Sequence, residues 1–379
     1  MRFCLVYDCL YPHTVGGAER WYRVLARELV AAGHDVTYLT RRQWKREERP
    51  EAPDGVRVVA VSRAGPLYDD DGRRRTLPPL EFGAGVARHL ATRRRAYDVV
   101  HTGSFPYFSV LGAAGALAGT RTQFGVDWIE AWPRAYWRAY AGPVTGTIGA
   151  RVQQAAIRVT GHAFVFSALT ARRLTDLGLR TPATRLPGLY HGEAVAVPPG
   201  EREPLVVFAG RHIADKRAHL VPEIVRAARA RVPGLRGLVL GDGPQRPRVL
   251  DAIAAAGMDG VVEAPGFVSA DAVHQALARA TCHLLPSERE GYGMVVIEAA
   301  ATSTPTVLVR EPESAAVELV DDGVNGIVAD DVAALAGAVV DVHAAGVTLR
   351  ESTARWYAEH AAGMTAQASA RVVEQTYAR

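Results

Sequence analysis

Two cations stand close together in a glycine-bearing segment in the second half of the chain. Arg211 follows Gly210 directly after an apolar run, and Lys216 comes shortly afterwards. The use of lysine here is selective, because Lys45 is the only other lysine in the sequence. A forked guanidinium and a compact ammonium can together neutralise a diphosphate and stabilise charge on a leaving phosphate. The alternative is a solvated loop that happens to carry charges.

Two carboxylates flank a second glycine-bearing turn. Glu290 precedes Gly291-Tyr292-Gly293 after the apolar run 282–285, and Glu298 lies in the helix expected over 294–301. A strand, a turn and a helix N-terminus offer free backbone N–H groups to a phosphate. At about 1.5 Å per residue, Glu298 is far enough from that end to hold a ribose diol, while Glu290 faces what lies beyond the phosphates. Alternatively Glu290 is a solvated turn residue and Glu298 a surface acid, although an unpaired carboxylate is costly in that apolar run.

Strands and helices that could position these residues alternate along the whole chain. Such alternation predicts an α/β protein with two doubly wound, Rossmann-like domains. We expect an N-terminal domain over 1–190, a proline-rich linker over 191–204, a C-terminal domain over 205–350, and a helical segment over 351–379 that could pack back on the first domain. In such a pair the carboxyl ends of the strands face each other across a cleft, which is where ligands bind. The predicted strands are 3–7, 36–39, 56–61, 99–101, 120–124 and 163–166, then 205–209, 237–240, 261–263, 282–285, 306–309 and 326–328.

Composition and charge exclude several classes of protein. The net charge of +4 includes no basic block long enough to follow a nucleic acid backbone, so a small anionic partner is expected. No apolar run approaches the roughly 18 residues of a membrane span, and the first apolar stretch is too short for a signal peptide. The cysteines show no metal-ligand spacing. These features predict a cytoplasmic protein that binds no nucleic acid.

Four short motifs recur in a fixed order in the second half of the chain. Together they resemble the motif series of the retaining family-4 glycosyltransferases, enzymes of the GT-B fold, and the pair Glu290 and Glu298 is the most recognisable part. The resemblance covers the expected C-terminal domain well and the N-terminal domain more loosely, through Gly16-Gly17. The motifs are Gly210-Arg211 with Lys216, Gly241-Asp242-Gly243-Pro244, Gly266-Phe267-Val268, and Pro286-Ser287 with Glu290-Gly291-Tyr292-Gly293 and Glu298-Ala299.

The resemblance implies roles for the charged residues of this series. Arg211 and Lys216 would bind the donor diphosphate, Glu298 would hold the ribose hydroxyls, and Glu290 would meet hydroxyls of the donor sugar. Phosphate neutralisation by cations and helix ends implies that no metal or other cofactor is needed.

The same resemblance implies roles for backbone groups. Gly291, Tyr292 and Gly293 would offer N–H groups to phosphate and sugar, and the backbone around Phe267 and Val268 would grip the base. From the other domain, Gly16 and Gly17 at the first helix N-terminus would approach the phosphates.

The sequence departs from the family pattern at one position. Members commonly carry His-x-His after the strand that corresponds to 98–101, with the second histidine near the reacting carbon, and this chain has His101-Thr102-Gly103. Asp127 and Glu130, which are expected to follow the next strand, are candidates to replace it. His101 is either a catalytic residue or a buried strand-end histidine, and the alternative for Asp127 is a helix N-cap.

A further segment is rich in aromatic residues. Trp128, Trp132, Tyr136, Trp137 and Tyr140 fall on about one helical face. They could form a packed face, a wall for an acceptor, or a surface that contacts a membrane. Peripheral contact with the inner membrane face is therefore a further option.

The expected function is transfer of a sugar from a UDP- or GDP-linked donor to a hydroxyl, with retention at the anomeric carbon. Acceptors in a natural product, a glycolipid or a cell-envelope glycan precursor all fit. Two rivals stay open. A nicotinamide-dependent oxidoreductase would need Gly-x-Gly-x-x-Gly, where the first loop offers only Gly16-Gly17. A non-catalytic nucleotide-sugar-binding protein would fit the absence of a histidine at Gly103.

Overall fold

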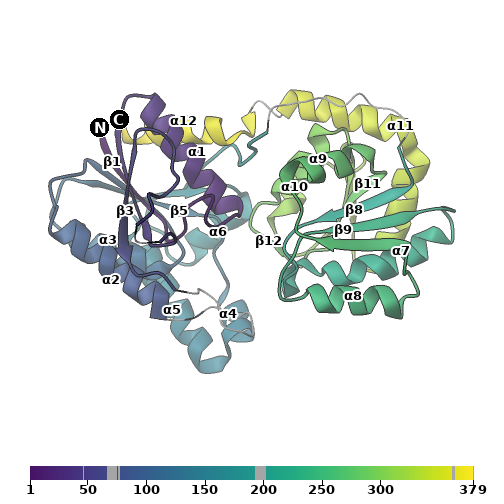
Figure 1. Cartoon of the computed structure of the whole chain (residues 1–379), viewed down its shortest axis with the longest axis horizontal. Helices are drawn as coiled ribbons and strands as arrows, with labels where there is room; N and C mark the ends of the chain where they lie inside the picture. Colours follow the sequence, from purple (N-terminus) through teal and green to yellow (C-terminus); the bar gives the residue numbers. More distant parts are fainter. Residues whose placement is uncertain (46, 66–74, 76, 193–201, 361–362, 379) are drawn as a thin grey trace. The chain divides into compact units, whose positions relative to one another are not determined.

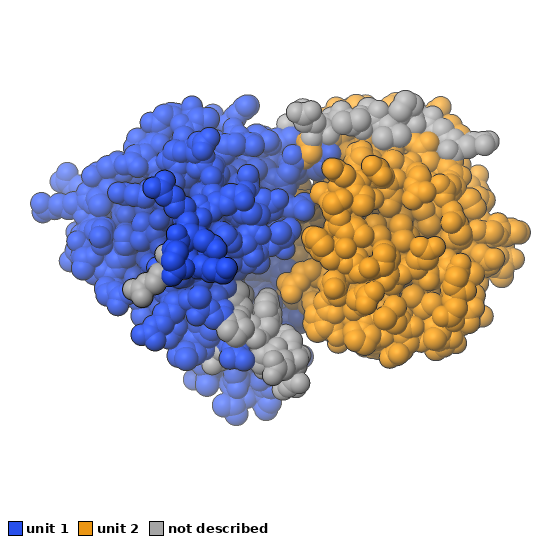
Figure 2. All heavy atoms as spheres, viewed as in Figure 1, with its two compact units in different colours: residues 1–191, 364–379 blue, residues 192–363 orange. Residues whose placement is uncertain are grey.

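The structure is a computed structural model that describes residues 1–45, 47–65, 75, 77–192, 202–360 and 363–378. The chain divides into two compact units (Figure 2). Unit 1 contains Met1–His191 together with Met364–Arg379, and unit 2 contains Gly192–Gly363. Among the described residues, no helix combines the length and apolarity that crossing a bilayer requires.

Unit 1 is a parallel sheet with helices on its faces (Figure 1). The strand order is β3-β2-β1-β4-β5-β6-β7, and it reverses direction between β1 and β4. The strands are β1 (Arg2–Val6), β2 (Asp35–Arg41), β3 (Val56–Ser62), β4 (Val99–Gly103), β5 (Gln123–Trp128), β6 (His162–Val165) and β7 (Thr184–Arg185). The helices are α1 (Gly17–Ala31), α2 (Leu77–Ala91), α3 (Tyr107–Leu117), α4 (Arg134–Ala141), α5 (Pro143–Val159), α6 (Ala168–Asp176) and α12 (Ala366–Tyr377).

Unit 2 is a second parallel sheet, with strand order β10-β9-β8-β11-β13-β15. Its strands are β8 (Leu205–Ala209), β9 (Arg236–Leu240), β10 (Val262–Gly266), β11 (Cys282–Leu285), β13 (Thr306–Val309) and β15 (Gly326–Ala329), and a small separate sheet pairs β12 (Arg289–Glu290) with β14 (Glu313–Ser314). The helices are α7 (Val221–Arg229), α8 (Arg246–Ala255), α9 (Ala270–Arg279), α10 (Met294–Ala301) and α11 (Leu335–His360), with short 3-10 turns η1 (Ala214–Lys216), η2 (Ala218–Leu220) and η3 (Ala315–Leu319).

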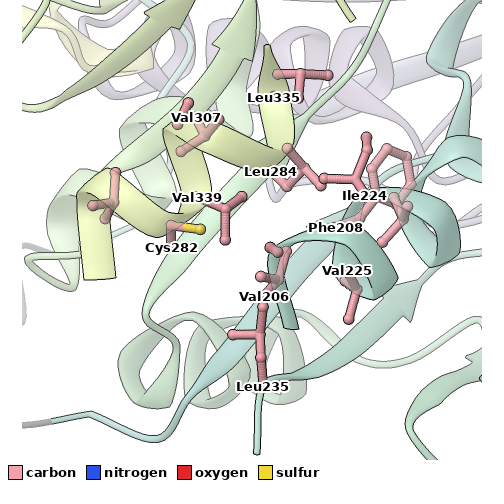
Figure 3. Close-up of a cluster of buried hydrophobic side chains, with 14 of the residues drawn as sticks. Val206, Phe208, Ile224, Val225, Leu235, Cys282, Leu284, Val307, Leu335 and Val339 are labelled. Carbon is pink, nitrogen blue, oxygen red and sulfur yellow. The ribbon is translucent and has the colours of Figure 1, made fainter. Parts of the chain in front are cut away.

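The central strand of unit 2 shows why its sequence is continuously apolar. All five residues of β8 are buried, because successive side chains point to opposite faces and helices cover both faces. Val206 and Phe208 pack with Ile224 of α7 and Leu284 of β11 in one cluster (Figure 3). Leu205, Val207 and Ala209 belong to a second cluster with residues of α9 and α10. This two-sided core fixes the carboxyl end of β8, where the cationic segment begins.

One buried histidine in this sheet makes the fold sensitive to acid. His283 of β11 has no exposed surface, and its Nδ1 atom lies 3.2 Å from the Thr306 hydroxyl. Burial lowers the pKa of His283 to about 3. The unfolded chain takes up this proton at a pH of about 6.5, so protonation favours unfolding.

We therefore expect the contribution of His283 to stability to be intact above pH 6.5 and to be lost as the pH falls towards 3. The loss approaches about 1.4 kcal/mol per pH unit for one proton. Urea unfolding at pH 7 and pH 5 measures it, and His283→Asn should lose less stability between these two values than the wild type. Equal losses in the two proteins would contradict this assignment.

Two differences between the observed elements and the sequence-based expectation concern β5 and the C-terminal helices. The strand expected over 120–124 is β5, which extends to Trp128, so Asp127 lies inside a strand and its interpretation as a helix N-cap is wrong. The helical stretch expected near the C-terminus consists of two helices, α11 and α12. The Thr365 hydroxyl caps α12 by accepting a hydrogen bond from the N–H of Ala368 at 3.1 Å.

The expected domain boundaries also differ from the two units. Helix α11 runs across residue 350, so the segment expected over 351–379 is divided between the units, and only Met364–Arg379 packs on unit 1. Residues 193–201 of the expected linker over 191–204 lie outside the described residues. Backbone hydrogen bonds from Tyr190 to Met364 and from Ala366 to Tyr190 attach the start of the terminal segment to unit 1.

Candidate active site

The switch point of unit 2 lies between β8 and β11, where the strand order reverses. In doubly wound sheets, ligands bind outside the carboxyl ends of the strands at this point. The residues that follow these two strands are Gly210-Arg211 and Pro286-Ser287. The fold therefore brings the cationic segment and the glutamate-bearing segment to one edge of one sheet.

Three glycine turns are joined side by side along this edge. The N–H of Gly210 donates to the carbonyl of Leu240 at 3.0 Å, and the N–H of Gly241 donates to the carbonyl of Gly266 at 3.0 Å. Gly241 has a φ of +122°, and a Cβ atom there would collide with the carbonyl oxygen of Gly210. Both the positive φ and the lack of room for a Cβ atom therefore require glycine at Gly241. Backbone groups at this edge are not covered by a side chain of residue 241.

The two oppositely charged residues with the most specific expected roles are in direct contact. The ammonium of Lys216 lies 2.6 Å from Oε2 of Glu290, and the side chains are 23% and 9% exposed. The backbone of Glu290 is itself held by β12, in which Glu290 is the register partner of Ser314 of β14. The expected phosphate cation and the expected sugar carboxylate therefore neutralise each other.

Neighbouring ion pairs lock the same two segments together. Asp215 accepts from the Arg289 guanidinium at 2.6 Å, and Arg217 lies 2.9 Å from Glu288. The N–H of Glu288 also donates to the carbonyl of Asp215 at 2.8 Å. We call these contacts, with Lys216–Glu290, the charge ladder. It pairs three successive residues of one segment (215–217) with three of the other (288–290).

Arg217 also occupies an unusual backbone conformation. Its φ is +47°, which non-glycine residues rarely adopt. Its guanidinium contacts both Glu288 and Glu311, at 2.9 and 2.5 Å. Two carboxylates thus hold the residue that turns the chain between η1 and η2.

Reversing one pair of the charge ladder should move Lys216 and Glu290 without touching them. We expect Asp215→Arg or Arg289→Asp alone to lower kcat/KM by about tenfold, because each places like charges together. The double exchange restores the attraction and should recover activity to within about threefold of the wild type. Steady-state kinetics on the four proteins, with melting temperatures as a control for folding, measures the coupling. Additive losses in the double variant would show that the pair does not position the site.

The other residues expected to bind the donor follow Glu290 in the sequence. Gly291, Tyr292 and Gly293 are buried, and Gly293 has a φ of +94° with a Cβ position 2.7 Å from Cβ of Ala316. Only glycine fits this position, where α10 begins. Glu298 lies within α10 and is half-buried.

Two residues that are expected to contact the nucleotide base follow β10, the edge strand of this sheet. Phe267 is 72% exposed, and Val268 is half-buried against the core. A large aromatic ring exposed at this position is available for stacking. Arg211 is also exposed.

The expected phosphate site in unit 1 contains an acid that the sequence-based expectation did not consider. Gly16 is the N-cap of α1, and Gly17 is the first residue of the helix. A Cβ atom at Gly16 would contact the carboxylate of Glu19, which lies in the first turn. An anion at this helix end therefore requires Glu19 to turn away.

Gly103, where the family pattern has a histidine, is closely packed. A Cβ atom at Gly103 would lie 2.8 Å from Cδ2 of Tyr7. The Tyr7 ring stacks on Tyr22, with ring centroids 4.8 Å apart. A larger side chain at Gly103 therefore needs Tyr7 to move.

His101 and Asp127 form one buried cluster with residues of α1 and α12. Nε2 of His101 lies 2.9 Å from Oδ2 of Asp127, and the indole N–H of Trp21 donates to the same oxygen at 2.7 Å. On the other side of the ring, Nδ1 of His101 lies 2.8 Å from the Tyr377 hydroxyl. Burial, and next the nearby Asp127, raise the pKa of Tyr22 well above its usual range.

His101 is 0% exposed and Asp127 is 1% exposed. Contact between either side chain and a sugar would therefore require the cluster to open. The imidazole of His101 thus lies between the Tyr377 hydroxyl and the Asp127 carboxylate.

Sequence reasoning missed the charge ladder and the roles of Trp21 and Tyr377. The neighbouring charges of both signs in 215–217 and 288–290 were a visible signal, but nothing local indicated that the two segments pair with each other. No group of three or more His, Cys, Asp or Glu side chains that could hold a metal ion occurs in the part of the chain that the structure describes.

Comparison with known families accounts for both units. The family described as "Glycosyl transferase 4-like domain" matches residues 16–188, and "Glycosyl transferases group 1" matches residues 203–344. The chain belongs to the family-4-type glycosyltransferases. Such a glycosyltransferase uses a nucleotide-sugar donor.

Individual relatives of this glycosyltransferase agree with the assignment. A D-inositol 3-phosphate glycosyltransferase of Acidothermus cellulolyticus is 28% identical, over 86% of this chain and 77% of that protein. A sucrose-phosphate synthase of Thermosynechococcus elongatus has a similar structure, with a TM-score of 0.78, 20% identity, and coverage of 99% and 98% of the two chains. The HepE protein of Anabaena, solved with UDP-glucose, gives a TM-score of 0.70 at 14% identity, with both chains fully covered. The structural neighbours identify the fold as GT-B.

Proposed function

We propose that this glycosyltransferase is a metal-independent, retaining hexosyltransferase that moves a sugar from a UDP- or GDP-linked donor to a hydroxyl. The observation that carries the proposal is the convergence of Lys216, Glu290 and the start of α10 at the switch point of unit 2. That edge combines a cation for the diphosphate, a carboxylate for sugar hydroxyls, and a helix N-terminus.

In this proposal, the donor diphosphate competes for the ammonium of Lys216 and releases Glu290. Arg211 adds a second cation, and the N–H groups of 291–293 face the phosphate and sugar. Glu298 holds the ribose, while Phe267 and Val268 contact the base. Gly16 and Gly17 approach the phosphates from unit 1 once Glu19 has turned away.

We propose a front-face reaction, which the resemblance to the retaining family-4 glycosyltransferases implies. The bond between the anomeric carbon and the phosphate oxygen breaks while the acceptor oxygen bonds to the same face of that carbon. The acceptor proton passes to an oxygen of the leaving phosphate. Lys216 and Arg211 stabilise the negative charge that grows on this phosphate.

His101 and Asp127 take a different role here from the direct one that the sequence suggested. Their burial and their contacts with Trp21 and Tyr377 favour a positioning role, in which they hold β4 and β5 beneath the loops that face the sugar. Opening of the cluster on donor binding is the alternative, in which Asp127 would reach the reacting carbon.

The proposed acceptor is a hydroxyl group of a natural product, a glycolipid or a cell-envelope glycan precursor.

The rival function is nucleotide-sugar binding without catalysis. Gly103 is the observation that favours it, because Tyr7 occupies the space that a histidine there would need.

Donor hydrolysis in the presence of excess EDTA tests the proposal. We expect UDP- or GDP-linked hexoses to be hydrolysed slowly, with the freshly released sugar in the donor's anomeric configuration by NMR. Saturable binding without turnover would favour the binding protein, and inversion or a strict need for Mg²⁺ or Mn²⁺ would overturn the mechanism.

A further inference from the structure

Arg246 places a cation at the carboxyl edge of the unit 2 sheet. It is the first residue of α8, and its backbone N–H donates to the carbonyl of Gly243 at 3.0 Å. Helix α8 therefore begins directly after the glycine turn that follows β9. Strand β9 pairs with the edge strand β10, which ends just before the residues expected to contact the base.

The Arg246 guanidinium lies against the end of β10. Its Nη2 atom donates to the carbonyl of Ala264 at 2.9 Å. A Cβ atom at Gly266 would lie 3.5 Å from Nε and 3.6 Å from Nη2 of Arg246. Gly266 has a φ of +93° and immediately precedes Phe267. The guanidinium is therefore next to the backbone at which the expected base-binding segment starts.

Most of the hydrogen-bonding capacity of this guanidinium is unused. An arginine side chain carries five N–H donors. Within the part of the chain that the structure describes, the Arg246 side chain makes one hydrogen bond and no ion pair, and its Nε atom is buried without a partner. The residue is half-buried. A donor that is removed from water without an acceptor is costly, so this position favours a ligand that brings an acceptor.

We propose that Arg246 selects the base of the donor by donating a hydrogen bond to a base carbonyl group. This inference rests on the proposed function, in which Phe267 and Val268 contact the base. Because arginine is only a donor, it attracts the O4 carbonyl of uracil and the O6 carbonyl of guanine. Cytosine and adenine carry an amino group at the corresponding position, which would face Arg246 donor to donor. Arg246 therefore favours UDP- and GDP-linked donors over CDP- and ADP-linked donors.

Two matched pairs of nucleotides test this selection, because UDP and GDP each have a carbonyl where CDP and ADP, respectively, have an amino group. Titration calorimetry of the full chain in the presence of EDTA measures the four dissociation constants. In any pair that binds, we expect the carbonyl-bearing nucleotide to bind at least about tenfold more tightly.

Substitutions at Arg246 should change this preference in a way that follows hydrogen-bond chemistry. Arg246→Gln should reduce it to below about threefold, because an amide can turn either its oxygen or its amino group towards the base. Arg246→Lys remains a donor and should keep it. The matched control is Arg248→Gln, since Arg248 lies on the same helix and is exposed, and it should leave the preference unchanged.

The ratio within a pair separates selection from stability, because partial unfolding weakens the binding of both nucleotides by the same factor. Equal binding within both pairs by the wild type would overturn the inference and leave the proposed function standing. An unchanged preference in Arg246→Gln, or a lost preference in Arg246→Lys or Arg248→Gln, would also overturn it. If none of the four nucleotides binds, the proposed function fails and this inference fails with it.

Discussion

Replacing Lys216 with alanine should lower kcat/KM for sugar transfer at least about tenfold while the fold stays intact, because a cation that faces the diphosphate contributes most as charge grows on the leaving group. Arg211→Ala should act in the same direction. Steady-state transfer or donor hydrolysis measures both losses. Unchanged rates in both variants would disprove the assignment of these cations to the diphosphate.

The structure supplies matched controls for this experiment. Lys45→Ala removes the only other lysine, whose side chain is 81% exposed, and it should leave activity unchanged. Lys216→Ala also leaves the Glu290 carboxylate without its cation, which costs stability. Adding Glu290→Gln to Lys216→Ala should restore the melting temperature but not the turnover. If turnover recovers as well, the activity lost in Lys216→Ala was lost through reduced folding stability.

Asp127→Ala should destabilise the protein by about 3 kcal/mol or more, because it leaves the buried Trp21 indole without its acceptor and the His101 ring without its neighbouring carboxylate. Asp127→Asn should cost less, since an amide oxygen still accepts one hydrogen bond. Tyr377→Phe removes only the hydroxyl beside His101 and should cost about 1 kcal/mol. Urea unfolding measures the free energy of unfolding of the three variants and should give the largest loss for Asp127→Ala.

The same variants distinguish positioning from direct catalysis. If Asp127 positions β4 and β5, stability and turnover should fall together in Asp127→Asn, and His101→Ala should behave similarly. Normal stability and donor affinity with a collapse in turnover for Asp127→Asn would instead mean that the carboxylate reaches the sugar.

The strands of unit 2 were predictable because burial on both faces makes them continuously apolar. β8, β11 and β13 have the bounds that the sequence indicates. β5 was misplaced because Asp127 interrupts its apolar pattern. This acid is tolerated inside a strand only because Trp21 and His101, from other elements, hold it. Local periodicity contains no information about such partners.

The candidate site shows the same limit. Glycine motifs and the two glutamates could be located by residue type and order, because their chemistry depends on local backbone geometry. The contact between Lys216 and Glu290 depends on two loops that only the sheet order brings together. Likewise, the Tyr7 ring beside Gly103 comes from another strand end. Pairings of this kind become visible only with the fold.

Thermal-shift titration of the full chain with nucleoside diphosphates, in the presence of EDTA, tests the central claim most directly. A ligand that binds the folded state stabilises it by RT ln(1 + [L]/Kd), so the melting temperature rises with ligand concentration. We predict a concentration-dependent increase with UDP or GDP that Lys45→Ala retains and Lys216→Ala loses. If no nucleoside diphosphate raises the melting temperature of the wild type, or if Lys216→Ala keeps the full shift, then the switch point of unit 2 is not the donor site.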